Sequence, residues 1–377
     1  MYARLLHAPE RQSFFLLGPR GTGKTAWARA TFPDALTFDL LDAQLYLRLV
    51  ANPALLSELV PQRYRGWVVV DEVQRVPELL NEVHRLIESR QLRFVLTGSS
   101  ARKLRGRGVN LLAGRALTRF MHPLTAIELG RDFDLQRALR YGCLPFACTT
   151  AEPADYLGSY VSTYLREEVQ QEGFARNVGA FSRFLEAASF SQGCVLNMAA
   201  VARESSVHAK VVEDYFTILE DLLIAVRVPI FARRAKRRLV AHPKFYFFDA
   251  GVFQAIRPRG PLDVPEEIQG PALETLFLQQ IRALNDSRAL GYSVHYWRTA
   301  KGDEVDFVLY GARGLRAFEI KRGVRIRPDD LKALRLFRDD FPESRAFLLY
   351  AGARRWHESG VDVVPFTAAV AELEQLL

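Results

Sequence analysis

The stretch FFLLGPRGTGKTAWARA, residues 14–30, decides the fold of this chain. Its first part, FFLLG at 14–18, is short and apolar, which is typical of a buried β-strand. A glycine-rich loop follows, and the side chains from Lys24 to Ala30 suit a helix. The stretch therefore predicts a strand, a loop and a helix in direct succession.

The loop has the composition of a site for a triphosphate group. A triphosphate needs backbone N–H groups that point inward, and glycines allow this because they lack Cβ and tolerate positive φ. Lys24 can reach the β- and γ-phosphates, while the Thr25 hydroxyl can bind Mg²⁺ at the helix N-terminus. The predicted ATP-binding residues are Gly18, Pro19, Arg20, Gly21, Thr22, Gly23, Lys24 and Thr25.

An acidic pair completes the predicted magnesium site. Asp71 and Glu72 come directly after the apolar run WVVV, residues 67–70. We expect Asp71 to hold Mg²⁺ together with Thr25, and Glu72 to act as general base on the attacking water. Acidic pairs after strands also cap helices, so this pair gains its significance from the upstream loop.

Two further residues are candidates for the same site. A third apolar run, RFVL at 93–96, ends in TGSS, and Ser99 is predicted to sense the γ-phosphate; a helix N-cap is the alternative. Arg115 follows a glycine and is predicted to stabilise charge on the transferring phosphoryl group, in cis or from a neighbouring subunit. An ordinary surface arginine is the alternative there.

The same apolar runs define the fold class. The segment PELLNEVHRLIESR, which separates the second and third runs, has apolar residues at helical spacing. Apolar strands that alternate with helices predict an α/β fold with a parallel sheet covered on both faces.

Four stretches of the chain carry a family resemblance: GPRGTGKT, VVVDEVQRVP, LTGSSARKL and LLAGRALTRFMHPLTAIELG. Together they resemble a family of prokaryotic AAA-type P-loop ATPases whose members have a C-terminal domain of unknown function similar to a restriction-endonuclease (PD-(D/E)XK) fold. The resemblance covers essentially the whole chain. It implies an AAA-like nucleotide domain, a winged-helix middle and a nuclease-like end, and Arg115 matches the family's glycine-arginine position.

The middle of the chain is predicted to be helical. Segments near 131–140, 153–171 and 178–190 have apolar residues at intervals of three and four. Residues 197–224 then predict two helices joined by a tight turn, and the basic stretch 225–249 predicts a hairpin. This is the order of a winged helix-turn-helix.

The predicted hairpin contains the densest basic run of the chain. Phosphate contacts from such a run give DNA affinity that depends on salt and not on sequence. A solvated turn is the alternative. The second helix, near His208 to Lys210, would be the reading helix, but its later part is acidic and apolar, so specific base readout is not expected. The basic residues are Arg233, Arg234, Lys236, Arg237 and Arg238.

The proline- and glycine-rich segment 257–271 is predicted to separate the middle from the C-terminal part. The three predicted domains are therefore 1–130, 131–256 and 257–377. After the boundary the sequence predicts a helix at about 271–284, strands near 293–298, 304–310 and 315–321, a helix at 328–341 and a strand at 345–350.

The predicted C-terminal strands contain a D…ExK pattern. Glu319 and Lys321 share one face of a strand because side chains alternate, and Asp306 lies on the neighbouring strand. Asp306 and Glu319, with Glu274 on the preceding helix, can hold a second divalent metal, and Lys321 can position a nucleophilic water for phosphodiester cleavage. A surface charge pair and a degenerate, non-cutting copy of the fold are the alternatives.

Composition limits the remaining possibilities. The chain has 377 residues, 49% hydrophobic and 25% charged, and a net charge of +8, which permits but does not require a polyanionic partner. It has three cysteines and no apolar run of 18 residues or signal peptide, so we expect a cytoplasmic protein that does not contact the membrane.

Two functions follow from these patterns. In the first, ATP binding and hydrolysis control a DNA-binding or nuclease-like C-terminal domain. In the second, the chain is an ATP-dependent signalling or scaffold switch whose inactive nuclease fold binds a protein partner. A homo-oligomer is compatible with both.

Overall fold

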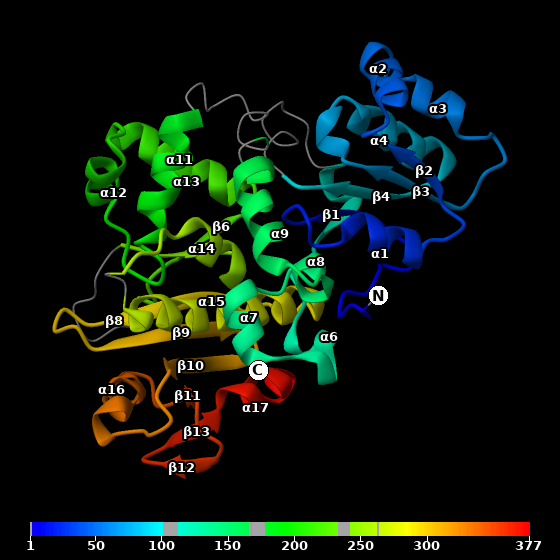
Figure 1. Cartoon of the computed structure of the whole chain (residues 1–377). Coiled ribbons are helices and arrows are strands. Elements are labelled where there is room, and N and C mark those ends of the chain that lie inside the picture. The colour runs from blue at the N-terminus through cyan, green and yellow to red at the C-terminus, as the bar shows by residue number, and fades with distance from the viewer. Residues whose placement is uncertain (1, 101–111, 166, 168–177, 233–241, 262–263) are drawn as a thin grey trace. The chain divides into compact units, whose positions relative to one another are not determined.

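The computed structural model describes residues 2–100, 112–165, 167, 178–232, 242–261 and 264–377. They form two compact units (Figure 1). The N-terminal unit comprises Arg4–His122 and Asp221–Ile224, and the C-terminal unit comprises Met1–Ala3, Pro123–Glu220 and Ala225–Leu377. The middle and C-terminal segments of the sequence thus belong to one compact unit.

A parallel five-stranded sheet forms the centre of the N-terminal unit, which confirms the predicted α/β class. Its strands lie in the order β2-β3-β4-β1-β5. All residues of β1 are buried, as expected for a parallel strand covered on both faces. The strands are β1 (Ser13–Leu17), β2 (Leu36–Asp39), β3 (Trp67–Asp71), β4 (Arg93–Gly98) and β5 (Ala116–Phe120).

Helices cover this sheet, blue to cyan in Figure 1. Leu79, Val83 and Leu86 on one side of α4 are fully buried with strand residues such as Val70 and Leu96. The helices are α1 (Lys24–Thr31), α2 (Ala43–Ala51), α3 (Leu55–Leu59) and α4 (Leu79–Arg90), with 3₁₀ turns η1 (Val73–Arg75) and η2 (Leu112–Gly114).

The strand order places one strand between the loop and the acidic pair. β4 lies between β3, which ends in Asp71, and β1, which precedes the loop. The order cannot be read from the sequence because all three strands are similar apolar runs. Its consequence is that polar residues at the end of β4 lie between the loop and the acidic pair.

The middle of the chain is mainly helical, as predicted, and two short strands, β6 and β7, pair antiparallel where the sequence predicts a hairpin. The elements are α6 (Ala126–Leu129), η3 (Gly130–Asp132), α7 (Leu135–Tyr141), α8 (Pro145–Thr149), α9 (Pro153–Ser159), a π-helical segment η4 (Tyr160–Leu165), α11 (Val178–Ser189), α12 (Met198–Ser205), α13 (Ala209–Asp221), β6 (Ala225–Val228), β7 (Lys244–Phe247) and α14 (Ala250–Ile256). The winged-helix assignment stays a prediction.

The C-terminal unit ends in a mixed six-stranded sheet of order β12-β13-β11-β10-β9-β8, yellow to red in Figure 1. Phe307 and Phe318 contact Phe277 of α15, whereas their neighbours Val308 and Ala317 pack with α16, so helices cover both faces. The elements are α15 (Pro265–Ser287), β8 (Ser293–Arg298), β9 (Glu304–Gly311), β10 (Gly314–Lys321), η5 (Pro328–Leu331), α16 (Lys332–Asp340), β11 (Arg345–Tyr350), β12 (Trp356–Glu358), β13 (Val361–Pro365), α17 (Phe366–Ala371) and α18 (Leu373–Leu376).

The predicted boundary segment is partly helical. Helix α15 begins at Pro265 and continues through Pro271, where we expected a helix only to begin. Pro265 suits the first turn because its missing N–H would have no partner there. Pro271 removes one backbone hydrogen bond, but Ala272 and Leu276 beyond it are fully buried, and this burial holds the helix together. Within the described ranges, every helix falls short of the length or apolarity needed to cross a bilayer.

Candidate ATP site and C-terminal carboxylate cluster

The glycine-rich loop has backbone conformations that require glycine. Gly21 and Gly23 have φ values of 83° and 93°, in the left-handed region that other residues rarely adopt. A Cβ on Gly18 would lie only 2.3 Å from the carbonyl oxygen of Met121. The loop therefore leads directly from β1 into the N-terminus of α1, where free N–H groups favour an anion.

Lys24 lies along this loop and is 5% exposed. Its Nζ donates hydrogen bonds to the carbonyl oxygens of Gly18 at 2.8 Å and Pro19 at 3.2 Å. A residue that sequence reasoning missed supports the loop from the side: Arg4 donates to the carbonyl oxygens of Thr22 at 2.8 Å and His122 at 2.6 Å. Nothing in the sequence near Arg4 indicates this contact.

Asp71 faces the loop and is bonded by hydroxyl groups. The Thr25 hydroxyl donates to Asp71 Oδ2 at 2.7 Å, and the Thr97 hydroxyl donates to Asp71 Oδ1. Asp71 is 2% exposed. Both of these donors are neutral hydroxyl groups, which orient the carboxylate without bringing a cation to it.

Glu72 and Ser99, two predicted site residues, are joined by a residue that was not predicted. Gln74 donates from Nε2 both to Glu72 Oε2 and, at 3.0 Å, to Ser99 Oγ. Glu72 has a left-handed backbone (φ 59°), and its N–H donates to the Thr97 hydroxyl at 3.1 Å. A non-glycine residue in this region marks a strained position that the surrounding structure has to stabilise.

Gly98 leaves the room that Gln74 needs. A Cβ on Gly98 would lie 2.7 Å from Gln74 Oε1. Together the contacts form a chain of hydrogen bonds from the end of β4 to the acidic pair at the end of β3.

The oxygen groups at the loop fit Mg²⁺. A small hard cation prefers carboxylate and hydroxyl oxygens together with phosphate oxygens. Thr25 and Asp71 present such oxygens in direct contact, so these two residues would hold Mg²⁺.

Arg115 lies at the other end of the sheet. Strands β1 and β5 are parallel, and Ser13 pairs with Ala116 while Leu17 pairs with Phe120. Arg115 thus precedes β5 at the edge opposite the loop, and its Nε donates to Glu88 Oε1, which lowers the pKa of Glu88. This position does not favour action in cis; action on a neighbouring subunit stays a prediction.

The C-terminal sheet brings the residues of the D…ExK pattern together, with Glu274 from α15 beside them. The N–H of Ile320 donates to Asp306 Oδ2 at 2.9 Å, which joins β9 to β10. Lys321 Nζ donates to Glu319 Oε1 at 2.7 Å. The negative charge of Asp306 adds to the effect of burial on both glutamates: the pKa of Glu274 rises to about 7, and that of Glu319 rises well above its usual value.

A second lysine, missed by sequence reasoning, lies inside this cluster. Lys244 of β7 is 2% exposed, and its Nζ lies 2.5 Å from Glu304 Oε1, 3.3 Å from Asp306 Oδ1 and 3.8 Å from Glu274 Oε2. Burial alone would lower the pKa of Lys244, but the acidic groups around it raise this pKa well above its usual value. The sequence holds one sign of this role: Lys244 begins the otherwise apolar strand KFYF, in which every residue is buried.

The cluster does not fit the predicted second metal. Across the described residues, no group of three or more histidine, cysteine, aspartate and glutamate side chains is arranged to hold a metal ion. At this site ammonium groups lie against Asp306, Glu304 and Glu319.

The predicted nucleic-acid residues are described only in part. The basic run Arg233, Arg234, Lys236, Arg237 and Arg238 lies outside the described residues. On α13 the residues Val212, Phe216 and Leu219 are fully buried, as expected for a helix that does not read bases. DNA binding by this part stays a prediction.

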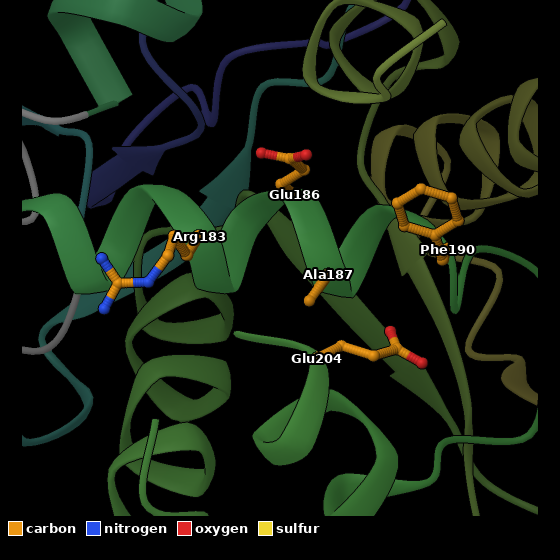
Figure 2. Close-up of a pocket in the computed structure, with 5 residues that line it drawn as sticks. All are labelled: Arg183, Glu186, Ala187, Phe190 and Glu204. Atoms are coloured by element: carbon orange, nitrogen blue, oxygen red, sulfur yellow. The ribbon is translucent and has the colours of Figure 1, made fainter. Parts of the chain in front are cut away.

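A hollow of about 470 Å³ lies between α11 and α12 (Figure 2). Its lining residues are Arg183, Glu186, Ala187, Phe190 and Glu204. The Arg257 guanidinium lies 3.6 Å from the centre of the Phe190 ring. None of the predicted site residues lines this hollow, so it adds nothing to either site.

Comparison with protein families agrees with the geometry of the loop. Residues 10–130 match the AAA domain family, residues 132–263 match a domain of unknown function (DUF8612), and residues 269–369 match another domain of unknown function (DUF4143). Residues 10–130 form an AAA-type P-loop domain. ATP and Mg²⁺ are the ligands that such domains generally use, in agreement with the arrangement of Lys24, Thr25 and Asp71.

Comparison with whole chains adds little. A search of curated proteins found no match. Among solved structures, Orc1 of Aeropyrum pernix in complex with DNA is 16% identical, with a TM-score of 0.29, over 66% of this chain and 87% of that one. Protein VC1899 of Vibrio cholerae is 13% identical, with a TM-score of 0.22, over 96% of each chain.

The third similar structure, Can2 of Sulfobacillus thermosulfidooxidans with cyclic tetra-adenylate, is 8% identical over 97% of this chain and 99% of that one, with a TM-score of 0.24. Scores this low do not extend the DNA or the cyclic nucleotide of those complexes to this chain.

Proposed function

We propose that this protein binds ATP with Mg²⁺ at the P-loop and hydrolyses it. The observation that carries the proposal is the 2.7 Å hydrogen bond between the Thr25 hydroxyl and Asp71 Oδ2, beside a loop whose glycines adopt left-handed conformations. One small region thus supplies an anion cradle and a cation ligand pair.

The residues divide the work of hydrolysis. The loop N–H groups and the α1 N-terminus bind the phosphates, and Lys24 turns from its carbonyl partners to the β- and γ-phosphates. Bound Mg²⁺ would neutralise negative charge on those phosphates. Glu72 takes a proton from the attacking water, the water oxygen bonds to the γ-phosphorus as the bond to the bridging oxygen breaks, and ADP and phosphate leave.

We further propose that the nucleotide state controls the C-terminal unit and that this unit contacts DNA. The net charge of +8 permits such a polyanionic partner. The network from Ser99 through Gln74 to Glu72 supports a response to the γ-phosphate, because Ser99 Oγ accepts from Gln74 and its O–H can donate to a phosphate oxygen, which would link the phosphate to Glu72.

A second candidate is a switch that binds a protein partner through an inactive nuclease-like fold. The lysines against Asp306, Glu304 and Glu319 favour it, because they take the charges that a catalytic metal would use.

The two candidates separate in one set of ATPase measurements. Phosphate release is measured with and without DNA, for the native chain, Lys321→Ala and Glu72→Gln, with Glu58→Gln on the exposed side of α3 as control. Stimulation by DNA supports the first candidate, and slow hydrolysis unaffected by DNA supports the second. Hydrolysis that survives in Glu72→Gln would contradict the proposed base.

A further inference from the structure

We propose that the carboxylate cluster of the C-terminal sheet is a binding site for a lysine ammonium, filled by Lys244 of the same chain, and that it excludes a divalent metal. The proposal rests on the C-terminal unit alone and holds whether or not the P-loop hydrolyses ATP.

The position of the ammonium is the first argument. Lys244 Nζ lies 3.3 Å from Asp306 Oδ1 and 3.8 Å from Glu274 Oε2. A divalent metal shared by these two carboxylates would lie about 2.0–2.6 Å from both oxygens. The ammonium beside these oxygens would repel a dication bound to them, so Lys244 opposes metal binding while it is in place.

Further hydrogen bonds to the same carboxylates are the second argument. Asp306 Oδ2 accepts the Ile320 N–H at 2.9 Å, and Glu274 Oε2 accepts the Tyr246 hydroxyl at 2.7 Å. Glu319 Oε1 accepts from Lys321 at 2.7 Å. Glu319 Oε2 is a buried oxygen without a hydrogen-bond partner among the described residues, but a divalent metal needs several oxygen ligands.

The anchoring of Lys244 is the third argument. Its strand β7 pairs with β6, and its backbone forms a bridge with Val195. Its Nζ lies 5.8 Å from the centre of the Tyr296 ring on β8, and the Tyr296 hydroxyl donates to the His242 carbonyl oxygen. These contacts fix the backbone of Lys244 beside the carboxylates, so the ammonium stays close to them as long as this part of β7 is in place.

The consequence is that buried ionic contacts hold together two segments of the chain, residues 132–263 and 269–369. The cation comes from the segment that matches one domain of unknown function, and the carboxylates come from the segment that matches the other. In this state the cluster joins the two segments and does not cleave phosphodiesters with a metal.

The native chain provides the first test. The 377-residue chain, free of nucleotide, is incubated with Fe²⁺, ascorbate and hydrogen peroxide, so that a bound iron cuts the backbone nearby, and fragments are identified by mass spectrometry. We expect no cuts within residues 304–321. Cuts in that range that Mn²⁺ suppresses would overturn the proposal.

Substitution of the lysine provides the second test. Lys244→Gln removes the ammonium at similar length, Lys244→Arg keeps a cation, and Mn²⁺ binding is followed by equilibrium dialysis. We expect Lys244→Gln to gain a bound Mn²⁺ that the added Asp306→Asn abolishes, and Lys244→Arg to gain none. A folded Lys244→Gln, judged by circular dichroism, that gains no Mn²⁺ would contradict the proposal; if it does not fold, the native-chain test decides.

Discussion

The ATP site and the C-terminal cluster both contain a buried aspartate, a lysine and neighbouring acidic groups, yet they differ in how the aspartate is held. At the P-loop, Asp71 accepts from the hydroxyls of Thr25 and Thr97, while Lys24 bonds backbone carbonyls. In the C-terminal cluster, Asp306 faces the ammonium of Lys244.

This difference shows that residue types alone do not define a metal site. A neutral hydroxyl orients a carboxylate and leaves its charge for an incoming cation, whereas an ammonium supplies that cation itself. The same residue types thus favour cation binding at the P-loop and stabilisation of the fold in the C-terminal cluster.

The largest expected effect is on stability, when the lysine of the second site is removed. Lys244→Ala leaves several buried acidic groups without their cation, so we expect the free energy of unfolding of the C-terminal unit to fall by about 3–5 kcal/mol. Urea unfolding monitored by circular dichroism measures this, with Lys332→Ala, at an exposed ion pair with Asp303, as control. If the free energy of unfolding fell by the same small amount in both variants, the stabilising role of the buried ion pairs of Lys244 would be contradicted.

The matching change at the first site affects activity. Lys24→Ala removes a cation that the phosphates need, so we expect ATP hydrolysis to fall roughly 100- to 1,000-fold with the fold retained. Phosphate release measures the effect, and Arg29→Ala, exposed on the same helix, is the control. Unchanged turnover in Lys24→Ala would place the active site elsewhere.

A third buried carboxylate sharpens the comparison. Asp249 accepts three backbone N–H bonds, from Cys143, Gly251 and Val252, and burial, only partly offset by these bonds, raises its pKa from 3.8 to about 6. The folded state therefore holds the proton of Asp249 more tightly than the unfolded state does. The contribution of this proton to the stability of the fold is complete below pH 3.8 and is lost as the pH rises to about 6.

The expected size of this loss is about 3 kcal/mol. Unfolding free energies measured across this range, for the native chain and for Asp249→Asn, test it. The difference between the two proteins should change with pH in the stated direction; a difference that is constant with pH would show that Asp249 does not titrate there.

The smallest expected effect concerns Gln74. Gln74→Ala frees Glu72 and Ser99 from each other, so we expect kcat for ATP to fall about tenfold, near 1.4 kcal/mol, with the Kd for ATP unchanged. Gln62→Ala, at an exposed position of the same unit, is the control. A change in Kd without a change in kcat would indicate that Gln74 shapes the binding pocket and does not position the base.

The sequence predicts one site far better than the other, for physical reasons. The loop from Gly18 to Thr25 is a contiguous motif whose geometry is local, and Asp71 follows a clear apolar strand. The position of β4 between β1 and β3 depends on long-range pairing, and no local pattern encodes it.

The second site shows the limit more clearly. Asp306, Glu319 and Lys321 were identified because the alternation of side chains on two neighbouring strands is local. Lys244 was missed because it comes from another segment and its role depends on packing against β9 and α15. A charged residue inside an apolar strand is the signal that would have pointed to it.

The most direct test of the account is Mg²⁺-dependent phosphate release from ATP by the full chain and by Asp71→Asn, with ATP binding measured in parallel. We expect the native chain to release phosphate only with Mg²⁺. We expect Asp71→Asn to bind ATP but to hydrolyse it at least roughly 100-fold more slowly than the native chain. Equal Mg²⁺-dependent turnover by the two proteins would contradict the assignment of Asp71 to the magnesium site.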